Sequence, residues 1–154
     1  MENIKLPELK LVGLKLDNKA TNEKGQSAID CGELWHKFEN EKVIMQIPEK
    51  LNNDIYAVYY DYDGDHTKPF SYFIGTRVKE NVQLPEGMTS LNIPEQNYTK
   101  VTAKGKLPDC IANYWIDIWN TAIDRSYSFD FEVYDERSKD WNNGEVDIFV
   151  STRE

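Results

Sequence analysis

The residues from Arg125 to Asp135 constrain the fold of this 154-residue chain most, because apolar and polar side chains alternate along them. A period of two is typical of a β-strand that is buried on one face. The apolar face carries Tyr127, Phe129, Phe131 and Val133, and the other face carries Ser128, Asp130, Glu132 and Tyr134. We expect the apolar face to pack on a core. The polar face is either solvated or forms the floor of a pocket, and the function of the chain depends on which.

The first half of the chain contains one predicted helix among predicted strands. Residues 8–16 alternate apolar with polar, which indicates a strand, and residues 27–41 carry apolar side chains at helical spacing. Two β-rich runs follow at 55–62 and 70–78, and the acidic turn Asp63-Gly64-Asp65 joins them into a hairpin. The predicted order is strand, helix, strand, strand.

The second half repeats this order. Residues 89–103 predict a strand with a bend or bulge at Pro94, and Pro108 suits the first turn of the helix that follows. The stretch 125–135 and a final strand at 146–150 form a second hairpin. A repeat of this kind is expected of a duplicated supersecondary unit.

Two β-α-β-β units, roughly 8–80 and 88–154, therefore predict one domain over residues 1–154. The expected fold class is α+β, with pseudo-twofold symmetry between the units and an antiparallel sheet that has both helices on one face. The run Tyr60-Asp61-Tyr62 of the first unit matches Glu132-Val133-Tyr134 of the second. This match predicts that Tyr60, Tyr62, Glu132 and Tyr134 look into one shared space.

The chain is strongly acidic, with a formal net charge of −9 at pH 7. Such a charge repels polyanions, and no basic stripe interrupts it, which argues against direct nucleic-acid binding. The same charge favours cationic small molecules. The chain also has nine Tyr, six Phe and four Trp, more than a core of this size usually contains. The surplus either lines a ligand site or lies half-exposed on the sheet.

No pattern predicts a metal site, a cofactor or a membrane segment. Cys31 and Cys110 stand alone, and the acidic turn at 61–65 lacks the glycine and glutamate spacing of an EF-hand calcium loop. The N-terminal residues show no signal-peptide pattern, and no run approaches the ~18 apolar residues of a membrane span. We therefore expect a cytoplasmic protein with reduced thiols.

Groups of residues along nearly the whole chain are similar, in the expected order, to one known family. The most specific group is Arg125 with residues 130–134; others are Leu34-Trp35, residues 55–59 and Trp115 with Ile118-Trp119. The chain resembles the GyrI-like, AraC-type effector-binding domains, in particular the stand-alone branch that includes integron-associated effector-binding proteins.

This resemblance implies an aromatic-lined central pocket that contains a glutamate from the strand after the second helix, here Glu132. Members of the family bind lipophilic, often cationic, small molecules, and many are fused to a helix-turn-helix DNA-binding domain. Here a strand is predicted almost at the N-terminus, so we expect no such module. The candidate ligand-binding residues are Glu132, Tyr134, Tyr60, Tyr62, Trp35, Trp115 and Trp119.

A carboxylate among aromatic rings suits an organic cation, because charge pairing acts together with cation–π attraction of about 0.5–2 kcal/mol per ring. In the empty pocket Glu132 needs either a raised pKa or hydrogen bonds from phenols, for which Tyr60 and Tyr134 are candidates. Arg125 either caps the C-terminus of the second helix or pairs with Asp130.

The leading hypothesis is a protein that binds lipophilic cations without a cofactor. In one alternative Glu132 and Tyr134 activate water, because some relatives resemble hydrolases of strained electrophilic rings. In another, the acidic surface mimics DNA for a protein partner, which the name of the gyrase-inhibitor superfamily suggests. The tryptophans on the two predicted helices either edge the pocket or serve only as core packing.

Overall fold

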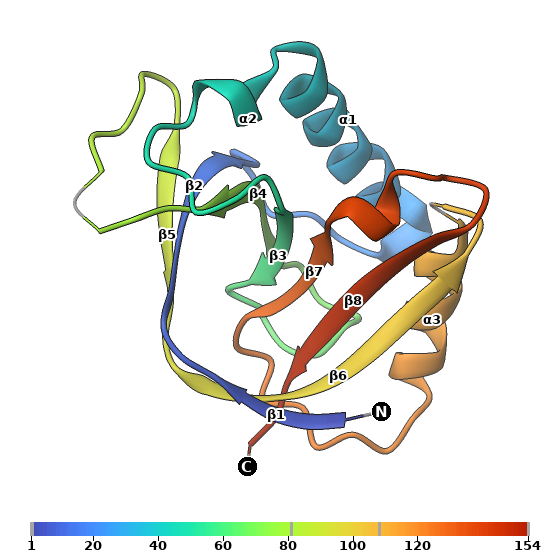
Figure 1. Cartoon of the computed structure of the whole chain (residues 1–154). Helices are drawn as coiled ribbons and strands as arrows, with labels where there is room; N and C mark the ends of the chain where they lie inside the picture. Colours follow the sequence, from blue (N-terminus) through green and yellow to red (C-terminus); the bar gives the residue numbers. More distant parts are fainter. Residues whose placement is uncertain (1, 81, 108, 154) are drawn as a thin grey trace.

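The computed structural model describes residues 2–80, 82–107 and 109–153, and its eight strands form one antiparallel sheet (Figure 1). The strands are β1 (Glu2–Leu6), β2 (Leu9–Lys15), β3 (Ile55–Tyr60), β4 (Ser71–Arg77), β5 (Thr89–Ile93), β6 (Gln96–Gly105), β7 (Asp130–Tyr134) and β8 (Gly144–Ser151). Their order in the sheet is β1-β6-β8-β7-β3-β4-β2-β5. The predicted α+β class is confirmed.

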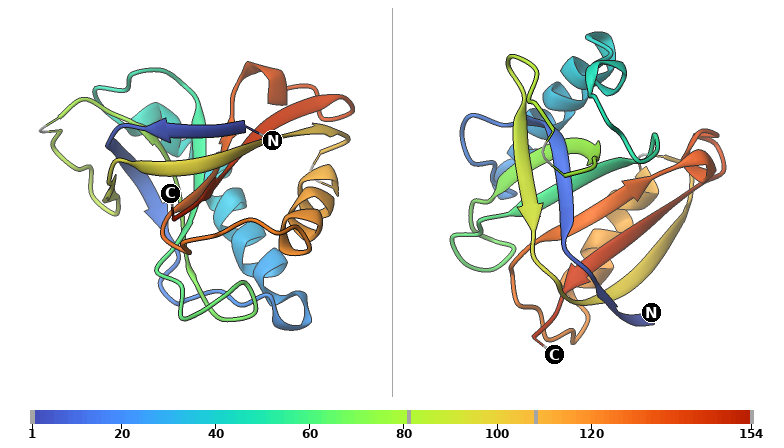
Figure 2. Two further views of the ribbon diagram at one scale, coloured as in Figure 1. Left: turned by 90° about the horizontal axis from the view of Figure 1, so that it is seen from below. Right: turned by 60° about the vertical axis from the view of Figure 1, so that its left-hand side comes forward.

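Two main helices accompany the sheet, α1 (Gln26–Asn40) and α3 (Asp109–Trp119). The shorter elements are α2 (Val43–Gln46) and the 3-10 turns η1 (Glu23–Gly25) and η2 (Glu136–Ser138). Figures 1 and 2 show α1 and α3 near each other on one side of the sheet, as the sequence predicts. The element order strand, helix, strand, strand is present in both halves, as β2-α1-β3-β4 and β6-α3-β7-β8.

The sheet is strongly curled, because two pairs of consecutive strands, β1 with β2 and β5 with β6, form both of its ends. At one end β1 pairs with β6, and at the other β2 pairs with β5. Both pairings keep a single register: Leu6 faces Gln96, and three residues further along each strand Leu9 faces Ile93. The predicted bend at Pro94 is confirmed, because it lies in the gap between β5 and β6. The curled sheet therefore has an inner and an outer face.

Alternation along the strands sends side chains to these two faces. The inner face holds a continuous core that includes Val58, Phe73 and Phe131, all at most 1% exposed. The outer face holds two further clusters, one beneath α1 and one beneath α3. Tyr59 and Tyr134 contact both outer clusters. The helices therefore meet the sheet side by side, along its central strands β3 and β7.

The strand expected over residues 125–135 is shorter than predicted, since β7 contains only Asp130–Tyr134. Tyr127 has φ of 53°, a left-handed conformation that bulky residues rarely adopt, and the chain turns there instead of extending. The turn lets Arg125 pair with Asp130, five residues later. The predicted position of Pro108 in the first helical turn lies outside the described residues.

Candidate functional site

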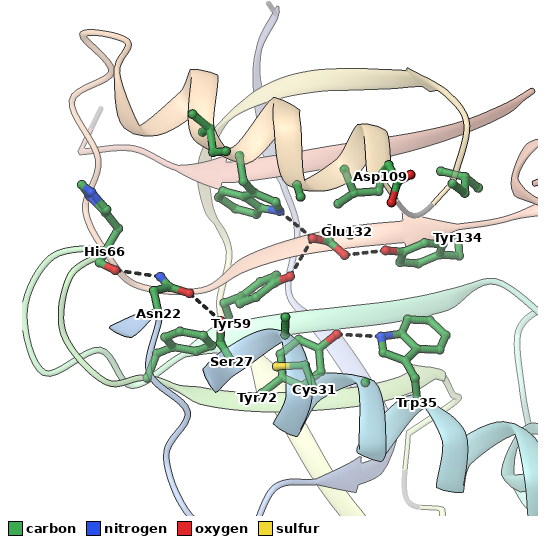
Figure 3. Close-up of a pocket in the computed structure, with 18 of the residues that line it drawn as sticks. Asn22, Ser27, Cys31, Trp35, Tyr59, His66, Tyr72, Asp109, Glu132 and Tyr134 are labelled. Atoms are coloured by element: carbon green, nitrogen blue, oxygen red, sulfur yellow. Dashed lines mark hydrogen bonds between the residues drawn. The ribbon is translucent and has the colours of Figure 1, made fainter. Parts of the chain in front are cut away.

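A cavity of about 880 Å³ opens between α1 and α3, and its floor is formed by side chains of the central strands (Figure 3). Its lining is mainly aromatic and apolar, with a few ionisable groups. Volumes of this size are typical of small-molecule sites. The helices supply the walls because each packs its own apolar cluster on the outer face and leaves the groove between the clusters unfilled.

Glu132 lies at the floor of this cavity. It is only 1% exposed, and it points to the outer face because its strand neighbours Phe131 and Val133 pack into the inner core. Directly across the sheet lies Ala57 of β3. This small residue leaves space beside the carboxylate for Tyr59, the next residue of β3 on the same face.

Three side chains donate hydrogen bonds to Glu132. The Tyr134 hydroxyl donates to Oε1 at 2.7 Å, and the Tyr59 hydroxyl and the Trp115 indole N–H donate to Oε2 at 2.7 and 2.6 Å. Figure 3 shows Tyr59 and Tyr134 reaching the carboxylate from different sides. Since a carboxylate has about four acceptor positions, most of its hydrogen-bonding capacity is used within the protein.

Burial and hydrogen bonding act on the pKa of Glu132 in opposite directions. Burial raises it, the bonds from Tyr134, Trp115 and Tyr59 lower it, and burial prevails, so the pKa lies above its usual value of 4.5. Burial and the nearby carboxylate also raise the pKa of Tyr59 and Tyr134 well above 10.0. Both phenols therefore keep their protons and act as donors.

Glu132 has no cationic partner within the described part of the chain, where every ion pair involves other carboxylates. Aromatic rings surround it instead. The Trp115 ring lies 5.2 Å from that of Tyr59, and the Trp35 ring lies 4.9 Å from that of Tyr134, both edge to face. Trp35 in turn donates to the Tyr72 hydroxyl at 2.8 Å. The carboxyl group of Glu132 is thus surrounded by aromatic side chains.

A second buried carboxylate, Asp130, lies two residues earlier on the same strand face. Arg125 Nη2 donates to its Oδ2 at 2.7 Å, and the Tyr62 hydroxyl donates to the same oxygen at 2.6 Å. The backbone N–H and hydroxyl of Ser151 donate to Oδ1. The predicted pairing of Arg125 with Asp130 is confirmed, and this carboxylate is neutralised within the protein.

One end of the cavity is closed by a contact between its two sides. His66, in the loop between β3 and β4, stacks on Trp119 at the end of α3, with ring centroids 4.9 Å apart. Asn22 donates to the His66 carbonyl and accepts from the Ser27 hydroxyl of α1. Figure 3 shows this end opposite the one that contains Trp35 and Tyr134.

Six of the seven candidate residues line the cavity: Glu132, Tyr134, Tyr62, Trp35, Trp115 and Trp119. Tyr60 does not. It lies on the inner face, where its ring stacks on Phe129 at 5.6 Å. The prediction that Tyr60 lies in the cavity is wrong. Tyr59, the preceding residue, lies there instead. The cross-strand pairing of Ala57 with Glu132 decides this, and no sequence pattern fixes that register.

The described residues include no cluster of three or more His, Cys, Asp or Glu side chains that could hold a metal ion. None of the helices in these parts of the chain is long and apolar enough to cross a membrane. The two cysteines, Cys31 and Cys110, are not bonded to each other. Burial raises the pKa of the Cys31 thiol to about 12, so this cavity-lining group stays protonated.

Comparison with known proteins identifies the family. The model of the Cass2 family, described as integron-associated effector binding protein, matches residues 4–151. The chain belongs to this family. The integron cassette protein VCH_CASS2 of Vibrio cholerae has the same fold, with a TM-score of 0.72 at 21% identity, over 99% of this chain and 95% of that one.

Two further relatives are informative. The structure of SAV2435 bound to tetraphenylphosphonium has a TM-score of 0.79 at 17% identity, over 99% of this chain and 93% of that one. The transcriptional regulator BrlR of Pseudomonas aeruginosa is 26% identical over 156 residues, which cover 96% of this chain and 53% of BrlR. The chain thus spans about half the length of that regulator. The description of the family names effector binding as the property of its members.

Proposed function

We propose that this effector-binding protein takes lipophilic organic cations into the cavity between α1 and α3, with Glu132 as their counter-ion. The observation that carries the proposal is a carboxylate 1% exposed, with three hydrogen-bond donors and no cation of its own in the described residues. An ionised group in such a place is costly unless a positive charge joins it. A cationic ligand supplies that charge.

The type of cation follows from the hydrogen bonds already present. Three donors leave Glu132 about one free acceptor position, so an ammonium group with several N–H bonds finds too few partners there. A cation whose charge is spread over carbon, such as a phosphonium or quaternary ammonium ion, needs no hydrogen bonds. Such an ion gains cation–π attraction from rings such as Trp35 and Trp115. Tetraphenylphosphonium, the ligand of SAV2435, is of this kind.

The same hydrogen bonds favour binding over hydrolysis. A general base needs a free lone pair directed at water, and Tyr59, Trp115 and Tyr134 occupy most of those of Glu132. We therefore expect ligands to be recovered unchanged after incubation. Because BrlR is a transcriptional regulator, we also propose that ligand occupancy of this domain serves gene regulation rather than metabolism.

A titration with tetraphenylphosphonium tests the proposal. Wild type is compared with Glu132→Gln, which keeps the shape and removes the charge, and with Glu136→Gln, which removes a charge from an exposed side chain of η2. We expect Glu132→Gln to lose about 1–3 kcal/mol of binding free energy, about five- to 150-fold in Kd. Glu136→Gln should bind as wild type does. Equal affinity of all three proteins would refute the role of Glu132.

A further inference from the structure

Trp141 is the most exposed of the four tryptophans, at 56%, and it lines the cavity. An exposed apolar side chain by itself needs no explanation. Of the large apolar side chains that are exposed in the described parts of the chain, however, only Ile116 and Trp141 also line the cavity. A side chain with both properties stands at the mouth of the cavity, where it contacts the interior and the solvent. Its indole is accessible to a ligand that enters.

The turn that carries Trp141 is fixed to the body of the protein. The Leu107 backbone N–H donates to the Trp141 carbonyl at 2.7 Å, and the Asn143 backbone N–H donates to the Asp140 carbonyl at 3.1 Å. A Cβ atom added to Gly144 would lie 2.5 Å from the side chain of Leu107, so the chain after the turn packs directly on this buried leucine. The backbone beneath the indole is therefore in place before a ligand binds, which lowers the entropy cost of binding there.

The two ends of the cavity differ in how their tryptophans are used. At one end the Trp119 ring stacks on His66, with an interplanar angle of 11°. Figure 3 shows Asp109, the first residue of α3, at the other end, and Leu107, which holds the Trp141 turn, lies two residues before it. Within the described ranges no aromatic pair or cation–π contact includes Trp141. The His66 end is thus closed by a ring stack, whereas the Trp141 end has an indole without a stacking partner there.

We propose that Trp141 forms an outer subsite at the open end of the cavity, which takes a flat aromatic group carried by the same ligand whose cation pairs with Glu132. The inference rests on the proposed function and narrows its ligand class to elongated cations with a distal aromatic ring. Such a ring stacks on the indole of Trp141 as His66 stacks on Trp119 at the other end.

The position of Glu132 along the cavity sets the length of such a ligand. Glu132 accepts a hydrogen bond from Trp115, which lies six residues after Asp109 in α3. At a rise of 1.5 Å per residue this is about 9 Å along the helix. The ligand therefore needs a spacer of about this length between its cation and its distal ring, and an extended hexyl chain provides it.

A set of matched probes tests the subsite. The probes are triphenylphosphonium ions with a propyl or a hexyl chain, each made with and without a terminal phenyl group. Their Kd values are measured in wild type and in Trp141→Ala, and the gain from the phenyl group is taken within each protein, so that a general effect of the substitution on binding cancels. For the hexyl pair we expect this gain to be about two- to tenfold smaller in Trp141→Ala than in wild type.

The propyl pair is the control for length, because its ring is too close to the cation to reach Trp141. Its gain should be the same in both proteins. The control for the substitution is Met45→Ala, which truncates an exposed side chain of α2 outside the cavity lining. This variant should bind every probe as wild type does. An equal gain in wild type and Trp141→Ala at both chain lengths would overturn the subsite, and an equal loss for the propyl and hexyl pairs would contradict contact through the distal ring.

A nuclear magnetic resonance measurement separates stacking from a structural role of Trp141. The indole N–H signal of Trp141 is identified by its absence from the spectrum of Trp141→Phe. In wild type saturated with ligand, we expect the phenylhexyl ion to move this signal further than the hexyl ion does, because a stacked ring adds its ring current. Equal movement with both ions would show that Trp141 acts through the shape of the mouth, and the subsite would be wrong.

The outcomes separate the two proposals. If neither hexyl ion binds wild type, the proposed function fails, and the subsite with it. If Glu132→Gln weakens both hexyl ions equally, while the gain from the phenyl group does not depend on Trp141, the counter-ion role stands and the outer subsite is refuted. A gain that depends on Trp141, together with the larger movement of its indole signal, supports both.

Discussion

Glu132 and Asp130 lie two residues apart on the same face of β7, at most 1% exposed, and among the described residues only Asp130 has a positive partner, Arg125. The two carboxylates therefore differ in the groups that stabilise them inside the protein. Asp130 is neutralised inside the protein and contributes to the fold. Glu132 is held by neutral donors, and under our proposal its charge is balanced by a cation that enters the cavity.

This difference predicts opposite effects of two similar substitutions on stability. Asp130→Asn leaves Arg125 buried without its counter-charge, so we expect a loss of about 3–5 kcal/mol in the free energy of unfolding. Glu132→Gln removes a charge that has no cationic partner in the described part of the chain, and the amide can accept from Trp115 and Tyr59 and donate to Tyr134. Its free energy of unfolding at pH 7 should equal or exceed that of wild type. Urea unfolding of both variants measures the contrast, and a destabilised Glu132→Gln would contradict it.

The raised pKa of Glu132 predicts how the stability of the empty protein depends on pH. The folded state holds this proton more tightly than the unfolded chain, so folding gains from it below the unfolded pKa, near 4.5. That gain is lost as the pH rises through the higher pKa of the folded state. Wild type should therefore lose stability relative to Glu132→Gln over this range. Thermal melts of both proteins from pH 4 upward test the sign, and parallel curves would exclude it.

The same titration predicts that cation binding weakens in acid. Because a lipophilic cation pairs with the ionised form, its affinity should rise as the pH increases through the pKa of Glu132 in the empty protein and then level off. Glu132→Gln should show no such rise. Fluorescence titrations with tetraphenylphosphonium at several pH values provide the measurement. A wild-type affinity that does not change with pH would mean that Glu132 remains ionised throughout or does not contact the ligand.

Tyr59 and Tyr60 form a matched pair for testing the register of β3. Tyr59 donates to Glu132, whereas Tyr60 stacks on Phe129 on the inner face. Tyr59→Phe removes a hydrogen bond that lowers the pKa of Glu132, so we expect a higher pKa and about 1 kcal/mol weaker cation binding in the pH range over which Glu132 titrates. Tyr60→Phe should leave Kd unchanged. If Tyr60→Phe weakened binding and Tyr59→Phe did not, the observed pairing of β3 with β7 would be wrong.

The reaction rate of the Cys31 thiol should show whether the cavity is occupied. Its thiol lines the pocket, and burial raises its pKa to about 12, so little reactive thiolate is present at neutral pH. We expect Cys31 to react slowly with a thiol reagent in the folded protein, and more slowly again when tetraphenylphosphonium is bound. Cys110 does not line the cavity, so the ligand should not change its rate. Mass spectrometry of labelled peptides distinguishes the two sites.

The sequence predicts much of this architecture because its signals are periodic. Alternation around Glu132 places that carboxylate opposite the core residues Phe131 and Val133, and helical spacing puts Trp115 and Trp119 on the side of α3 that lines the cavity. The pairing of Arg125 with Asp130 could also be anticipated from their proximity along the chain. These features depend on neighbours in sequence.

The features that the sequence does not predict depend on register and on the turn before β7. The match of Tyr60-Asp61-Tyr62 to Glu132-Val133-Tyr134 follows residue types, whereas the sheet pairs Ala57 with Glu132. A shift of one residue moves every side chain of a strand to the other face, so the structure places Tyr59 where the sequence match predicts Tyr60. No sequence pattern indicates the left-handed conformation of Tyr127, so alternation predicts a longer strand than the structure contains.

The most direct test of the central claim compares two ligands of the same shape that differ only in charge. The (biphenyl-4-ylmethyl)trimethylammonium ion and the neutral 4-neopentylbiphenyl are titrated into wild type and Glu132→Gln. If Glu132 is the counter-ion, wild type prefers the cation, the variant loses about 1–3 kcal/mol for the cation alone, and the neutral ligand binds both proteins equally. If the substitution weakens both ligands to the same extent, Glu132 acts through the shape of the cavity and the cation-binding proposal is wrong.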